Sequence, residues 1–194
     1  MSDPEETFYT EERWQNWLDR VEQQDLDPEE EDSARLLLNL QDDAAIALAK
    51  IVRAFEEDRL DEAAATEEIE EVREVVLAEV EMDDEETAML IDGVQTSLVP
   101  VFYAAEEYVV GGPPPEGTVG EYVEAAADAE AAEDMDAALG YLVQAGTLIV
   151  DGAELPMDAV EELEYGLVSE WVNGLDSLQT AMADPEVVEE DDDG

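Results

Sequence analysis

The sequence predicts an all-α bundle of about seven helices, and three observations support this prediction. Apolar residues recur at spacings of three and four along most of the chain, which is the period of a helix with one buried face. Hardly any window alternates between apolar and polar residues, so we expect no sheet. Helix start and stop signals divide the chain into segments of helical length. Helices joined by short connectors form a bundle.

The first two expected helices cover residues 10–24 and 27–58. Thr10 is a suitable N-cap for the first helix, because its hydroxyl can accept a hydrogen bond from a free backbone N–H. The second has a start signal, Asp27-Pro28-Glu29-Glu30, with an acid at the cap, Pro at the first position and acids in the first turn. The inward face of the first helix is expected to carry Trp14, Trp17, Leu18 and Val21.

Two further helices are expected over residues 62–80 and 83–110. Asp61 can cap the first of them, and Asp83 and Glu86 have the spacing of a capping box that opens the second. Pro100 lies inside this second helix. We expect it to kink the helix, because its ring removes one backbone hydrogen bond and crowds the preceding turn.

The clearest break in the chain is the segment GGPPPEG at 111–117, which is rich in glycine and proline. Immediately after it, Thr118 and Glu121 form a second capping box. Helices are therefore expected over 118–132 and 135–150.

A last helix is expected over residues 156–183, ended by an Asp-Pro pair and followed by a disordered acidic tail at 184–194. A chain of this length buries enough surface for one core. We therefore expect a single all-α domain over residues 1–183. It is expected to have two lobes, a four-helix lobe over 10–110 and a three-helix lobe over 118–183.

Two glycines lie inside the last expected helix. Gly166 and Gly174 would each destabilise a helix interior by about 1 kcal/mol relative to alanine. We expect that close packing against a neighbouring helix requires them.

Acidic residues dominate the composition: 57 Asp plus Glu stand against 7 Lys plus Arg, for a formal net charge of -50. The acids are spread along the whole chain, and residues 74–194 contain no base at all. Repulsion between charges acts over about 10 Å at 0.1 M salt but only about 3 Å at 1 M. This composition is typical of a protein adapted to molar salt. We expect a cytoplasmic protein of a halophile that requires high KCl for folding.

The composition also excludes several kinds of site and partner. The absence of Cys and His excludes disulfides, Cys-ligated or His-bound metals and a Ser-His-Asp triad. The negative charge repels nucleic acid and anionic membranes. The N-terminal MSDPEETFY lacks the apolar core of a signal peptide. The stretch 87–105 has the length of a membrane span, but Asp92, Pro100 and the lack of a cationic flank argue against one.

Carboxylate clusters are too common in this chain to mark a catalytic site. Four glutamates on one expected helix could hold Mg²⁺, as paired acids do in the all-α nucleotide pyrophosphatases: Glu67, Glu68, Glu70 and Glu71. Phosphate chemistry also needs Lys or Arg, and none follows Arg73. We therefore expect no enzyme, no cofactor and no metal. The alternatives are a divalent-metal-dependent hydrolase that uses helix carboxylates and an acidic mimic that binds basic proteins.

Three segments are nearly free of charge: 87–105, 137–150 and 171–183. They are either core helices or a surface kept free of carboxylates because a partner docks there. On the last helix, uncharged polar side chains are expected to face outward beside a tryptophan, a residue type common in binding hot spots. The partner-binding candidates are Ser169, Trp171, Asn173, Ser177 and Thr180. The helix that contains Pro100 is the second choice.

Four segments carry a resemblance to a known family: RWQNWLDRVEQQDL at 13–26, NLQDDAAIALAKIV at 39–52, GVQTSLVPVF at 93–102 and LEYGLVSEWVNGLDSLQ at 163–179. As a set they resemble a haloarchaeal family of acidic helical proteins described only as a domain of unknown function. The resemblance spans nearly the whole chain and implies an archaeal cytoplasmic protein, but no activity, ligand or catalytic residue. The sequence favours a non-enzymatic protein that binds another protein or itself. On this view Asn173→Asp and Ser177→Asp weaken partner binding and leave helicity unchanged.

Overall fold

The computed structural model describes residues 8–24, 26–27 and 29–183, and over these residues it contains eight helices and no strand. The prediction of an all-α bundle is confirmed, and the tail predicted at 184–194 lies outside the described residues. The helices are α1 (Glu11–Gln23), α2 (Glu31–Glu56), α3 (Glu62–Val76), α4 (Glu85–Gly111), α5 (Val119–Ala131), α6 (Met135–Val150), α7 (Met157–Glu161) and α8 (Leu167–Ala183).

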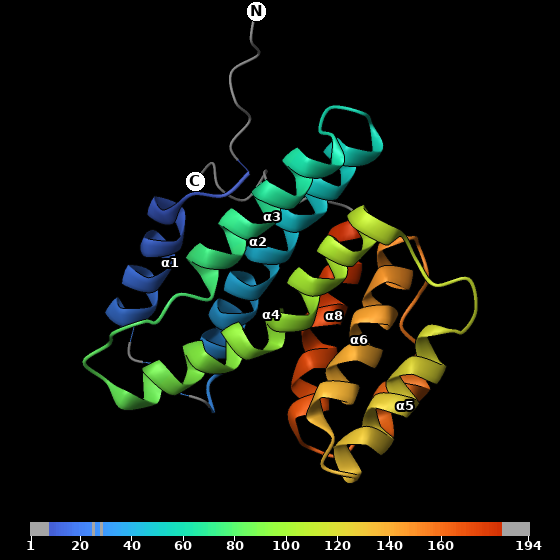
Figure 1. Cartoon of the computed structure of the whole chain (residues 1–194). Coiled ribbons are helices and arrows are strands. Elements are labelled where there is room, and N and C mark those ends of the chain that lie inside the picture. The colour runs from blue at the N-terminus through green and yellow to red at the C-terminus, as the bar shows by residue number, and fades with distance from the viewer. Residues whose placement is uncertain (1–7, 25, 28, 184–194) are drawn as a thin grey trace, which may run out of the picture.

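The central helix of the bundle is α4. It packs against α2 and α3 on one side and against α6 and α8 on the other (Figure 1). The last helix, α8, contacts α2 as well as α6, so it lies against helices from both sides of the 111–117 linker. One hydrophobic core includes Leu40 of α2, Phe102 of α4, Leu142 of α6 and Leu178 of α8, all fully buried. The division into two lobes stays a prediction.

Three of the predicted helix caps are confirmed. The hydroxyl of Thr10 accepts a hydrogen bond from the backbone N–H of Arg13 at 3.1 Å, and the carboxylate of Asp61 accepts one from Ala64 at 2.8 Å. Thr118 and Glu121 form the predicted capping box, with backbone N–H to side-chain oxygen distances of 3.2 and 2.9 Å. These caps are local interactions, which explains why sequence spacing alone predicts them.

The starts of α2 and α4 differ from the prediction. Asp27 forms a turn instead of capping a helix: its carboxylate accepts from the N–H of Glu29 at 2.9 Å, and its carbonyl accepts from Glu30 at 2.9 Å. Helix α2 therefore begins at Glu31. Helix α4 is capped by Asp84, one residue later than predicted, because the Asp84 carboxylate accepts from the backbone N–H of Thr87 at 3.2 Å.

The predicted single helix over 156–183 is wrong, because the structure divides it into α7 and α8. The free N–H groups at the start of α8 find acceptors outside the helix backbone. The carboxylate of Glu130 on α5 accepts from Val168 at 2.9 Å, and the hydroxyl of Ser169 accepts from Gly166 at 3.0 Å. A Cβ at Gly166 would lie 2.7 Å from a Glu130 oxygen, so the glycine admits this carboxylate. Gly166 therefore precedes the helix and does not lie inside it.

Helix α4 continues through Pro100 to Gly111 as one element, and Pro100 itself is buried. Among the described residues, α4 is the one helix whose length and composition would allow it to cross a membrane. Half of its apolar window is buried inside the bundle, and a core helix of a soluble protein meets the same criterion. The apolar character of 87–105 is accounted for by its central position.

Candidate functional site

The five partner-binding candidates do not lie on one exposed face of α8. Asn173 and Thr180 are exposed and Ser169 is half-buried, but Ser177 and Trp171 are buried, with exposed fractions of 3% and 6%. The prediction that Ser177 faces outward is wrong. Partner binding by the exposed members stays a prediction.

Ser177 is buried because it belongs to a hydrogen-bond network that joins α2, α4 and α8. The Gln41 amide of α2 donates to the Ser177 hydroxyl at 2.8 Å and to the Asn173 carbonyl at 3.1 Å. The Ser97 hydroxyl of α4 donates to the Gln41 side-chain oxygen at 2.8 Å. Buried polar groups require such partners, and this network satisfies them within the bundle. The uncharged polar side chain at position 177 is therefore part of a hydrogen-bond network inside the bundle.

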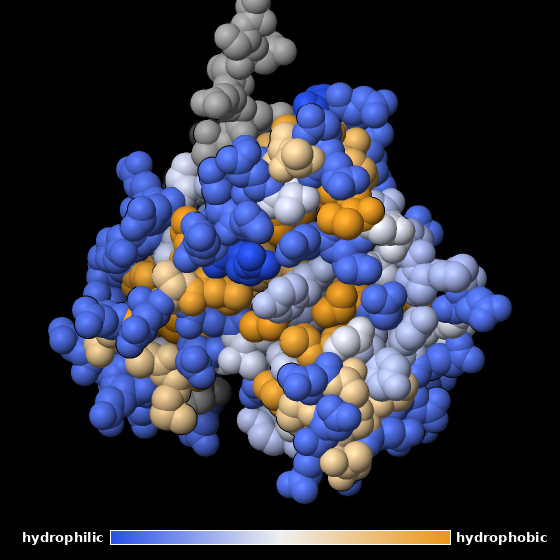
Figure 2. All heavy atoms as spheres, viewed as in Figure 1, coloured by the Kyte–Doolittle hydropathy of each residue, from blue (hydrophilic) through white to orange (hydrophobic). Residues whose placement is uncertain are grey.

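Tyr103, near the end of the weakly charged segment 87–105, lies at the surface beside the first half of the segment 137–150. A groove of about 580 Å³ lies between the second half of α4 and the first half of α6. Its uncharged floor includes Tyr103 and Val110 of α4 with Leu139, Gly140 and Val143 of α6. Tyr103 is 42% exposed and Val110 is 56% exposed. Figure 2 shows hydrophobic side chains in a broken band across the middle of this face, with hydrophilic side chains around it.

The rim of this groove is charged. Three carboxylates line it, those of Glu106, Glu107 and Asp136. Arg73 of α3 reaches over from the side: its guanidinium lies 5.6 Å from the centroid of the Tyr103 ring and donates to Glu106 at 3.1 Å. This contact holds the aromatic ring in place and neutralises one of the carboxylates. The groove therefore has an apolar floor and a mainly acidic rim.

Close packing between α4 and α6 places the two sides of the groove next to each other. A Cβ at Gly146 of α6 would lie 2.5 Å from the Cβ of Ala104, so this glycine allows the two helices to approach. The inward face of α4 buries Val101, Phe102 and Ala105 in the core. Tyr103 and Val110 lie on the other face of the same helix. Sequence analysis identified the segments that contain Tyr103 and the α6 side of the groove, but it did not single out Val110 or show that the two helices are neighbours.

The four glutamates considered for a metal site lie along α3: Glu67, Glu68, Glu70 and Glu71. Within the part of the chain that the structure describes, no group of three or more acidic side chains is placed so that it could hold a metal ion. The alternative of a metal-dependent hydrolase therefore gains no geometric support.

Comparison with known proteins gives a family match. A family model described as "Uncharacterized protein conserved in archaea (DUF2150)" matches residues 7–191. No curated protein and no solved structure matches the chain. All eight helices lie within the matched range, and the archaeal origin implied by the sequence resemblance is confirmed. The haloarchaeal part of that resemblance stays a prediction.

Proposed function

We propose that this chain, which belongs to the archaeal DUF2150 family, is a non-enzymatic module that binds another protein through the groove between α4 and α6. The observation that carries the proposal is the exposed, uncharged floor of that groove in a chain with 57 acidic residues. A solvent-exposed surface in such a chain is normally covered by carboxylates. Exposed apolar area that lacks them is typical of an interaction site.

The side chains at the groove are suited to binding. Tyr103 provides a large aromatic surface, and aromatic residues contribute strongly to protein interfaces. Tyr103 is already held in position by Arg73, so little side-chain freedom is lost on binding.

The charge of the groove favours a different protein over a second copy of this chain. Every groove residue except Arg73 comes from 74–194, a stretch without a single base. Two copies meeting at this surface would bring Glu106, Glu107 and Asp136 of each close to those of the other. Salt screens charges within an interface much less than exposed charges, so these carboxylates would repel even at high KCl. A partner with an apolar ridge flanked by Lys or Arg avoids this repulsion. We place the interaction in the cytoplasm of an archaeal cell with high KCl.

The test is a comparison of capture by the wild-type chain and by three variants, in an archaeal lysate kept in molar KCl. Tyr103→Asp and Gly140→Asp each add a carboxylate to the groove floor, and space around Gly140 is open. Tyr165→Asp is the control, because Tyr165 is 94% exposed and does not line the groove. We expect a stoichiometric partner with the wild type and Tyr165→Asp but not with the other two.

The retained protein is then purified and its affinity measured by calorimetry. Each groove variant should weaken binding by about tenfold or more, since both put a charge where apolar surface is buried. Circular dichroism of each variant controls for folding. Equal binding by all variants would exclude this groove. Binding that disappears as KCl rises, irrespective of the variant, would instead favour the acidic-mimic alternative.

A further inference from the structure

A larger hollow lies on another part of the surface, between α1 and the segment that joins α3 to α4. Its volume is about 900 Å³, and it shares no residue with the α4–α6 groove. We call it the α1 groove. Its apolar lining includes Trp14 and Leu18 of α1, which are only 4% and 7% exposed, and the half-buried Val75, Val80 and Met82 on the opposite side.

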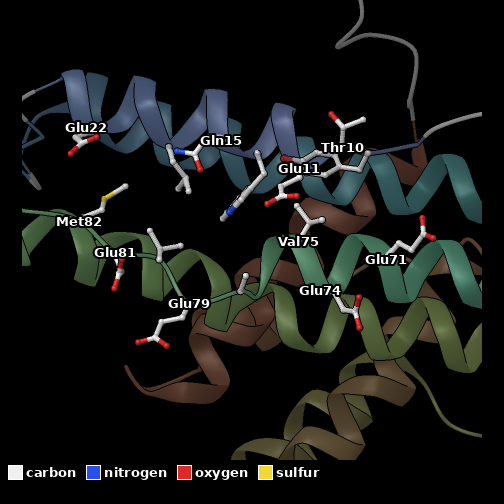
Figure 3. Close-up of a pocket in the computed structure, with 15 residues that line it drawn as sticks. Thr10, Glu11, Gln15, Glu22, Glu71, Glu74, Val75, Glu79, Glu81 and Met82 are labelled. Atoms are coloured by element: carbon white, nitrogen blue, oxygen red, sulfur yellow. The ribbon is translucent and has the colours of Figure 1, made fainter.

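Both edges of the α1 groove are acidic. Glu11 and Glu22 come from α1, and Glu71, Glu74, Glu79 and Glu81 come from the end of α3 and the connector after it (Figure 3). Among the residues that line it, none is Lys or Arg. The six carboxylates of the lining are therefore not balanced by any cation within the groove.

Specific hydrogen bonds hold both walls of the α1 groove. On one side, the buried carboxylate of Asp43 in α2 accepts from Arg13 Nε and from Trp17 Nε1 of α1, each at 2.8 Å. On the other side, the Gln95 amide of α4 donates to the carbonyls of Val76 and Ala78, each at 2.8 Å. The groove is therefore formed before any ligand arrives, which lowers the entropy cost of binding.

An apolar trough between two acidic edges matches one kind of ligand. A helix with a single apolar stripe can place that stripe on the half-buried Val75, Val80 and Met82. Lys or Arg on both flanks of the stripe would then meet the glutamates of the two edges. We propose that the α1 groove is a second binding site, for a basic amphipathic helix of a partner protein.

The probe for the test is a fluorescein-labelled peptide of about 18 residues, which is about five helical turns. It carries Leu at positions i, i+3, i+4 and i+7 and Lys elsewhere. A second peptide has the same composition with the Leu positions scrambled. Binding is measured by fluorescence anisotropy at the lowest KCl concentration that gives full helicity. The scrambled peptide should bind about tenfold more weakly, since it has no apolar stripe.

Two variants of equal charge locate the binding site. Ala78→Trp fills the α1 groove, because the exposed Ala78 side chain lines it. Ala131→Trp is the matched control, at an exposed position at the end of α5 that lines no part of the groove. The first should weaken peptide binding by about tenfold and the second should leave it unchanged, since only the first removes space for the ligand.

A second pair of variants tests the acidic edges. Glu74→Gln combined with Glu79→Gln removes two charges from the groove, and Glu161→Gln combined with Glu162→Gln removes two exposed charges elsewhere. Only the pair of substitutions in the groove should weaken peptide binding, by about fivefold. Equal effects of both pairs, equal binding of both peptides, or no effect of Ala78→Trp would each overturn the proposal in favour of general attraction to an acidic surface.

This inference does not depend on the function proposed for the α4–α6 groove. Tyr103→Asp should leave peptide binding unchanged, because Tyr103 does not line the α1 groove. A loss of peptide binding in Tyr103→Asp would show that the peptide uses the other surface and would overturn the assignment to the α1 groove.

Discussion

Gly174 of α8 lies directly against the backbone carbonyl of Ser97 of α4, so that a Cβ added to Gly174 would overlap the carbonyl oxygen. The Ser97 side chain is also a member of the network with Gln41. Backbone contact and polar network therefore meet at one point where α2, α4 and α8 come together. This contact fixes the distance between α4 and α8, and it cannot relax by a side-chain rotation because it involves the backbone.

We expect Gly174→Ala to lower the free energy of unfolding by about 2 kcal/mol. Overpacking costs about 1–3 kcal/mol and occasionally more, and a Cβ that overlaps a backbone carbonyl lies at the upper end of this range. A net loss of about 2 kcal/mol remains after a gain of up to about 1 kcal/mol in helix propensity. Gly93→Ala is the control, because a Cβ there meets nothing within 4 Å. Gly93→Ala should stabilise the protein slightly. The measurement is urea unfolding at constant KCl, and stabilisation by both substitutions would contradict the close contact.

The parts of the fold that sequence predicts depend on neighbours in the chain. Thr10, Asp61 and Thr118 cap their helices through residues three positions away, so spacing is sufficient. The break before α8 could not be predicted this way, because Glu130 supplies an acceptor from 38 residues away. The apolar spacing of three and four continues across the break, and periodicity alone therefore favours a single helix.

Prediction of the candidate sites from sequence is limited in the same way, because it detects only patterns among neighbours in the chain. Low charge in 137–150 marks one side of the groove, but the low charge of 87–105 points only to Tyr103 on the other side and misses Val110. Only tertiary packing shows that these residues line one groove. Ser177 was expected to face outward because it is polar. Its partner, Gln41, is 136 residues away in sequence, and no pattern within α8 reveals it. The close packing inferred for Gly174 needed no knowledge of its neighbour, since a helix interior rarely tolerates glycine without such a reason.

Ser177→Asp and Asn173→Asp should now have different effects. Ser177→Asp puts a carboxylate at a buried position beside Asp42 and should destabilise the fold by about 3 kcal/mol, the scale of an uncompensated buried charge. Asn173→Asp changes an exposed side chain and should alter the free energy of unfolding by less than about 0.5 kcal/mol. Urea unfolding compares the two. Equal effects would contradict the burial of Ser177.

Asp42 should make stability depend on pH. Burial raises the pKa of the Asp42 carboxyl above its ordinary value, the hydrogen bond with Ser177 opposes this shift, and the charge of Asp176 adds to it. A raised pKa in the folded state means that the fold holds the proton more tightly than the unfolded chain. The stability this provides is present at low pH and is lost as pH rises through the folded-state pKa.

Asp42→Asn removes this dependence, because asparagine stays neutral. The advantage of Asp42→Asn over the wild type in free energy of unfolding should therefore grow as pH rises through the folded-state pKa of Asp42. Asp32→Asn, an exposed acid of the same helix, controls for the loss of one charge. Urea unfolding across this pH range, at constant KCl, provides the measurement. An advantage that grows equally for both variants would show that net charge, and not the site, is responsible.

The excess of 50 negative charges should make the fold depend on salt. Two like charges about 10 Å apart in water repel by roughly 0.4 kcal/mol, and this repulsion is summed over many neighbouring acids. The screening length falls from about 10 Å at 0.1 M salt to about 3 Å at 1 M, which removes most of that repulsion. We expect helicity and the urea midpoint to rise with KCl.

Circular dichroism in a KCl titration measures helicity, with sucrose as an uncharged control that cannot screen. Full helicity at about 20 mM KCl, where screening is weak, would contradict this account.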